Sequence, residues 1–179
     1  HGAMDTKPSI IELAKKTYGS LHDRTVLLVG AGKIGRMCAK LLLDSGIKKL
    51  YLSNRTAERA DALVEELSGE AVPFEKMDEM FGKVDIVITS VSASKPLITK
   101  DRLMESAGFR EGSPITFIDL GVPRNIDPAV ADIGNVVLFN IDSLKELNRE
   151  IIFEDGTGEE KAEKIMNTRI HEFDSWIRE

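Results

Sequence analysis

The sequence has few of the residues that form disulfides, metal centres or membrane spans. Its single cysteine, Cys38, excludes an internal disulfide and leaves no thiol cluster for zinc, which suits a reducing compartment. No two of its three histidines have metal-ligand spacing with a carboxylate, so no metal site is predicted. We see no signal peptide and no apolar run long enough to cross a bilayer. We therefore expect a cytoplasmic protein without membrane contacts.

The chain is also too acidic for non-specific nucleic-acid binding and too short for two full domains. Its formal net charge is -6, and its 179 residues have room for one good-sized core with an appendage. Residues 1–4 are interpreted as the remnant of an expression tag. Residues 5–141 are predicted to form one domain. In residues 142–179 acidic side chains outnumber basic ones and apolar residues recur at helical intervals, which predicts a helical extension interrupted at Gly156-Thr-Gly158.

The strongest local signal is a glycine-rich turn after an apolar run of strand length. Apolar residues recur at helical spacing after the turn, so the pattern predicts strand, tight turn and helix. In such a turn a pyrophosphate approaches the backbone and lies at the positive end of the helix. We favour dinucleotide binding over a purely structural turn. The candidate residues are Gly30, Ala31, Gly32, Lys33, Ile34 and Gly35.

The end of the next predicted strand, residues 49–53, indicates which dinucleotide fits. An NAD site expects Asp or Glu there to bind both ribose hydroxyls, but this chain has Asn54, Arg55 and Thr56. Without a carboxylate there is no repulsion toward a 2′-phosphate, which a guanidinium and a hydroxyl can bind. We therefore predict NADPH. In the alternative interpretation, Thr56 only caps the following helix and Arg55 is a solvated surface charge.

The rest of the pattern predicts an α/β fold, a Rossmann-like doubly wound parallel sheet of strand order 3-2-1-4-5-6. Helices are expected from Pro8 to Ser20 and from Thr56 to Leu67, the latter closing around Gly69, and a short third strand at residues 71–72. In such sheets the loops at the carboxyl ends of the strands line the ligand crevice. Thr89, Ser90, Val91 and Gly121 are the candidates for the nicotinamide side.

Two further residues were weighed as functional groups. Arg124 could bind a carboxylate or phosphate, or could pair with Asp119 or Asp127. Cys38 falls on the buried face of the helix after the glycine turn, where a thiol packs as a small apolar group. No catalytic group is identified in the chain.

Together these segments resemble the NADPH-binding domain of glutamyl-tRNA reductases. The most specific segment is residues 119–128, since the glycine turn and Asn-Arg-Thr also occur in shikimate dehydrogenase-like proteins. The resemblance rests on Gly-Ala-Gly-Lys-Ile-Gly35, Ser-Asn-Arg-Thr56, Asp-Ile-Val-Ile-Thr-Ser90, Ile-Asp-Leu-Gly-Val-Pro-Arg-Asn-Ile-Asp-Pro128 and Asn140-Ile-Asp-Ser-Leu-Lys145.

The resemblance implies NADPH-dependent reduction of glutamyl-tRNA to glutamate 1-semialdehyde in tetrapyrrole (porphyrin) biosynthesis. It also implies a catalytic domain with a nucleophilic cysteine, which would contact the tRNA and is absent here, and a homodimer joined beyond a long spinal helix. For this chain alone we expect a monomer without activity, and Gly156-Thr-Gly158 casts doubt on a straight spine. The alternatives are a shikimate dehydrogenase-like NADP-dependent oxidoreductase and a non-catalytic NADP(H)-sensing module.

Overall fold

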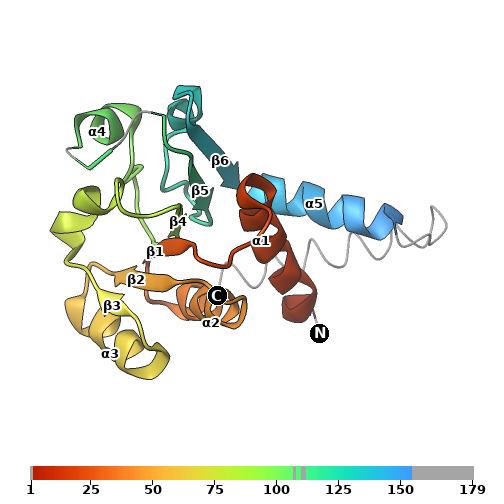
Figure 1. Cartoon of the computed structure of the whole chain (residues 1–179), viewed down its shortest axis with the longest axis horizontal. Coiled ribbons are helices and arrows are strands. Elements are labelled where there is room, and N and C mark those ends of the chain that lie inside the picture. Colours follow the sequence, from red (N-terminus) through yellow and green to blue (C-terminus); the bar gives the residue numbers. More distant parts are fainter. Residues whose placement is uncertain (1, 107, 110–111, 155–179) are drawn as a thin grey trace.

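A six-stranded parallel sheet with helices on both faces organises the computed structural model, which describes residues 2–106, 108–109 and 112–154 (Figure 1). The strand order is β3-β2-β1-β4-β5-β6, so the predicted order is confirmed. The strands are β1 (Thr25–Val29), β2 (Lys49–Ser53), β3 (Glu70–Ala71), β4 (Ile86–Thr89), β5 (Ile115–Asp119) and β6 (Val136–Asn140).

The central strands are buried along their whole length because helices cover both of their faces. Every residue of β4 and β5 is buried, as a parallel sheet inside an α/β fold requires. The register pairs Val29 with Ser53 and Thr89, and Thr89 with Asp119. The last residues of four neighbouring strands therefore lie in one row, and the loops that follow them meet at one edge.

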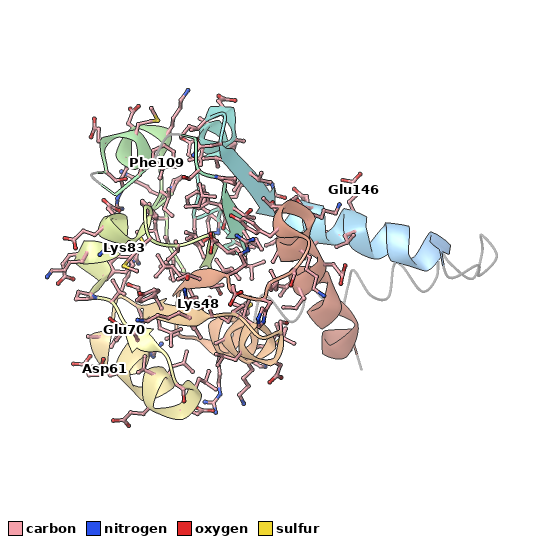
Figure 2. The ribbon with its side chains drawn as sticks, viewed as in Figure 1. Lys48, Asp61, Glu70, Lys83, Phe109 and Glu146 are labelled. Carbon is pink, nitrogen blue, oxygen red and sulfur yellow. The ribbon has the colours of Figure 1, made fainter. Side chains whose placement is uncertain are left out.

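The two helical layers differ in size. One face carries α1 (Gly2–Tyr18), α2 (Lys33–Asp44), α3 (Ala57–Leu67) and α5 (Ile141–Glu154). The other carries the short helices η1 (Phe74–Met80), α4 (Lys100–Glu105) and η2 (Pro128–Asp132). Side chains fill the space between the sheet and both layers, while Asp61, Lys83 and Glu146 lie at the periphery (Figure 2).

Three predicted element boundaries were wrong. Helix α1 begins at Gly2, so Pro8 is the seventh residue of the helix and does not lie in its first turn. Helix α3 is closed by Ser68, which adopts φ 60°, and not by Gly69. Gly69 instead allows close packing, because a Cβ there would lie 3.0 Å from the Leu50 carbonyl oxygen. Strand β3 begins one residue early, at Glu70.

Helix α5 continues directly from β6. The Asn140 side chain accepts a hydrogen bond from the Ser143 N–H at 3.2 Å, and the Ser143 hydroxyl accepts one from the Asn140 N–H at 3.1 Å. This reciprocal pair caps the helix. Leu144 and Leu147 anchor its first turns in the core, and α5 packs beside α1 (Figure 1). The predicted break at Gly156-Thr-Gly158 lies outside the described residues, and within them no helix is long and apolar enough to cross a membrane.

Candidate functional site

A cavity of about 590 Å³ lies at the carboxyl edge of the sheet, where four loops meet. It gathers most of the predicted site residues from positions far apart in the sequence. The lining residues are Ala31, Gly32, Lys33, Ile34, Asn54, Arg55, Thr56, Arg59, Ser90, Val91, Ser92, Leu120, Gly121 and Val122. Of the predicted residues, only Gly30, Gly35 and Thr89 do not line it.

The three glycines of the turn have three different surroundings. Gly30 adopts φ 118°, and a Cβ there would collide with the Ser90 carbonyl. A Cβ on Gly35 would collide with the Gly30 carbonyl, so this glycine allows α2 to pack closely on the turn. Gly32 has an ordinary φ of -81° and no atom within 4 Å of a Cβ position. Gly30 and Gly35 thus shape the turn, whereas Gly32 borders open space in the cavity.

Asn54 joins the glycine turn to the end of β2. Its Oδ1 accepts a hydrogen bond from the Ala31 N–H at 3.1 Å, and its Nδ2 donates to the Thr56 carbonyl at 3.0 Å. These contacts fix the distance between the first loop of the cavity and the residues that the sequence assigned to a ribose and its phosphate.

Arg55 lines the cavity and connects two of its loops. Its guanidinium donates to the Ser92 carbonyl at 3.1 Å and stands 5.8 Å from the centre of the Phe74 ring. Arg55 and Ser92 also line an adjoining hollow of about 610 Å³ that extends to Pro123. The side chain is therefore oriented by neighbours rather than freely solvated.

Arg59 is a cavity residue that the sequence prediction missed. It lies in the first turn of α3, whose N-cap residue, Thr56, makes no capping hydrogen bond with its side chain. The helix dipole disfavours a cation in the first turn of a helix. An arginine at this position was therefore the signal from which the sequence could have indicated an anion-binding role. Arg55 and Arg59 bring two guanidinium-bearing residues to one end of the cavity.

The other end is walled by the loops after β4 and β5, residues 90–92 and 120–122. Thr89 lies just beneath this wall, fully buried, and its hydroxyl donates to Asp119 Oδ1 at 3.2 Å. One interpretation of the sequence paired Arg124 with Asp119 or Asp127, and the structure shows another partner. Arg124 bonds to Asp142 at 2.9 Å, because the Asp119 carboxylate is occupied by main-chain N–H groups of its own loop.

Comparison with known proteins shows the family to which the chain belongs. The family model for shikimate / quinate 5-dehydrogenase matches residues 12–147. The chain belongs to this family. The glutamyl-tRNA reductase of Thermodesulfovibrio yellowstonii is 41% identical to this chain over 167 residues, which cover 93% of this chain and 39% of that relative. The chain thus spans well under half the length of the curated relative.

Solved structures agree with the family assignment. The structure titled "Glutamyl-tRNA Reductase from Methanopyrus kandleri" has a TM-score of 0.77 at 35% identity and covers 96% of this chain and 43% of that one. The nucleotide binding domain of the Thermoplasma volcanium glutamyl-tRNA reductase has a TM-score of 0.64 at 21% identity and covers 85% of this chain and 97% of that one, which shows the shared fold. The resemblance to glutamyl-tRNA reductases inferred from the sequence is confirmed.

In this member of the shikimate / quinate 5-dehydrogenase family the only thiol is unreactive. Cys38 is fully buried on α2, and burial raises the pKa of its thiol to about 12. The neutral thiol is a poor nucleophile at physiological pH, so the interpretation of Cys38 as a packing residue is confirmed. The described residues also contain no group of three or more His, Cys, Asp or Glu side chains that could hold a metal ion.

Proposed function

We propose that this chain is the NADPH-binding module of a glutamyl-tRNA reductase. Glutamyl-tRNA would be reduced to glutamate 1-semialdehyde by the enzyme to which the module belongs, in tetrapyrrole biosynthesis. One observation carries the proposal: a single cavity combines a glycine turn at a helix N-terminus with two guanidinium-bearing residues and no carboxylate at the ribose position. The names of the matched relatives support it.

The residues present fit a dinucleotide. A Cβ on Gly32 would meet no atom of the protein. The absence of a side chain at this position therefore leaves room for a ligand in the cavity. The positive end of α2 points at the same place, where a pyrophosphate is stabilised. Gly30 to Gly35 would hold that pyrophosphate, Asn54 to Thr56 and Arg59 the adenosine ribose with its phosphate, and residues 89–91 with Gly121 the nicotinamide side.

The division of labour follows from what the chain holds. When bound, NADPH supplies the hydride. This chain orients the cofactor and keeps its nicotinamide side between two walls that are themselves fixed by hydrogen bonds. A nucleophile that could hold the glutamyl group is not found among the described residues, because Cys38 is buried and protonated. We assign that nucleophile, the tRNA contact and the homodimer contacts to the remaining length of the enzyme.

Calorimetric titration of the chain with NADPH and with NADH tests the cofactor assignment. We expect NADPH to bind at least about tenfold tighter, a difference of ~1.4 kcal/mol, because Arg55 and Arg59 meet the 2′-phosphate. Arg55→Asp should weaken NADPH much more than NADH, since it replaces an attractive charge by a repulsive one.

Lys48→Asp is the matched control. It makes the same charge change on an exposed side chain that precedes β2, at the opposite end of this strand from Arg55 (Figure 2). It should leave both affinities unchanged. Equal affinities for the two cofactors, or equal losses in Arg55→Asp, would remove Arg55 from the phosphate site. Binding of neither cofactor would contradict the proposal as a whole.

The family description favours one alternative to be tested alongside, a shikimate dehydrogenase-like NADP-dependent oxidoreductase. The purified chain incubated with NADP⁺ and shikimate should show no increase in absorbance at the wavelength of NADPH. Turnover would support this alternative over the reductase module. Nucleotide binding with no role in reduction by the longer enzyme would favour an NADP(H)-sensing module.

A further inference from the structure

The loops that follow β4 and β5 are joined by one buried side chain that does not line the cavity. Asn125 is 0% exposed. Its Oδ1 accepts a hydrogen bond from the Val91 N–H at 3.1 Å, and its Nδ2 donates to the Val91 carbonyl at 2.9 Å. The side-chain amide therefore pairs with both polar groups of one residue in the other loop, much as a neighbouring strand would.

The main chain of Asn125 is held equally firmly on its other sides. Its N–H donates to Asp119 Oδ2 at 2.9 Å. Its carbonyl accepts from the N–H groups of Leu97 at 2.7 Å and Ile98 at 3.1 Å. All four polar groups of Asn125 thus have partners on three separate segments, which leaves its amide little freedom to move.

Asp119 supplies the base of this arrangement. The carboxylate is 2% exposed and accepts from the N–H groups of Gly121 and Ile126, both at 2.9 Å, as well as from Asn125 and Thr89. The loop after β5 is therefore wrapped around a buried charge at the end of its own strand. Asn125 transmits that fixed position to Val91.

Val91 is the point where the arrangement reaches the cavity. It lines the cavity, as Gly121 does, and its Cγ1 lies 3.2 Å from the position that a Cβ on Gly30 would occupy. A shift of Val91 would change the width of the cavity and its clearance at the glycine turn together. No residue of the other end of the cavity touches Asn125 through a hydrogen bond that the described part of the chain shows.

We infer that Asn125 is a positioning residue that holds Val91 in place for the nicotinamide half of the cofactor. The inference rests on the proposed function. Without the amide, the Val91 peptide loses both partners and its loop samples several positions. Ordering that loop then costs free energy each time the nicotinamide half binds, whereas the adenosine half meets Asn54, whose side-chain hydrogen bonds go to Ala31 and Thr56 and not to this loop.

Two ligands separate the halves of the site. NADPH occupies both, whereas 2′,5′-ADP carries the same 2′-phosphate and no nicotinamide. In calorimetric titrations we expect Asn125→Ala to weaken NADPH by roughly three- to tenfold and 2′,5′-ADP by less than about twofold. Asn125→Asp keeps the acceptor for the Val91 N–H but turns a buried carboxylate oxygen toward the Val91 carbonyl, so it should weaken NADPH at least as much as Asn125→Ala.

Asn135→Ala is the matched control. Asn135 also joins two loops, donating to the Ser113 carbonyl at 2.7 Å, but it lies at the amino ends of β5 and β6. It should leave both affinities unchanged. An unchanged NADPH affinity in Asn125→Ala, or equal losses for both ligands, would overturn the positioning role.

Amide hydrogen exchange without ligand tests the restraint by itself, with each variant first shown to unfold cooperatively. Exchange at Val91 should accelerate in Asn125→Ala, while exchange at Ser90, whose N–H bonds to the Val29 carbonyl at 2.8 Å, should not. Unchanged exchange at Val91 would overturn the inference. If the wild type bound neither ligand, the proposed function would fall with the ligand part of the inference, and exchange alone would decide whether Asn125 restrains the loop.

Discussion

The two ends of the cavity are built by different means. The end near α2 and α3 combines a main-chain turn of glycines with the exposed residues Arg55 and Thr56. The end near β4 and β5 depends on a buried carboxylate and a buried amide that fix two loops from behind. The first end offers charge and open space to a ligand, whereas the second has no charged side chain among its lining residues. The stability of the protein should therefore be more sensitive to mutation behind the second end.

The largest effect should follow removal of the buried charge. Asp119→Ala leaves three N–H donors of its loop without an acceptor, so we expect the free energy of unfolding to fall by about 3–5 kcal/mol in urea denaturation. Asp142→Ala is the control, because the Asp142 side chain is 72% exposed and pairs only at the surface with Arg124. It should cost less than about 1 kcal/mol. Similar losses in both variants would mean that the loop does not depend on Asp119.

Two glycines of the turn should divide stability from binding. Gly30→Ala forces a side chain against the Ser90 carbonyl at a positive φ and should lower the free energy of unfolding by about 2–3 kcal/mol. Gly32→Ala meets no protein atom and should change it by less than about 0.5 kcal/mol, yet weaken NADPH by roughly tenfold or more because the Cβ enters the cavity. Unfolding curves and calorimetry measure the two effects. Full NADPH affinity in Gly32→Ala would show that the turn is structural.

The smallest effect concerns the pH dependence of stability that the buried Cys38 thiol of α2 should cause. Because burial raises the pKa of the Cys38 thiol to about 12, the folded chain keeps a proton that the unfolded chain releases above its ordinary value near 9. Stability from this group is complete below pH 9 and is lost as the pH rises toward 12. Between pH 8 and 10 the wild type should lose about 1–2 kcal/mol more than Cys38→Ala. Equal losses of unfolding free energy in the wild type and in Cys38→Ala would show that the pKa of the thiol is not raised by burial.

The sequence predicted the elements whose signals are local. The strand order followed from alternating apolar runs and helical periodicity, and the tight packing at Gly30 and Gly35 followed from their spacing. Contacts between distant residues carried no such signal. Asn125 lies 34 positions from Val91, and nothing in either segment indicates the pairing. One of the two interpretations of Arg124 paired it with Asp119 or Asp127, but the fold brings it to Asp142, at the start of α5.

The direct passage from β6 into α5 has a geometric consequence. A loop between the two would let the helix change its orientation relative to the strand. Here Asn140, the last residue of β6, caps the helix by exchanging hydrogen bonds with Ser143. The axis of α5 is therefore set by the twist of the sheet at its edge strand. Asp119 and Asn140 are paired across β5 and β6, so the base of α5 lies beside the end of the strand whose following loop walls the cavity. The orientation of any domain joined to α5 would therefore be set relative to the cavity.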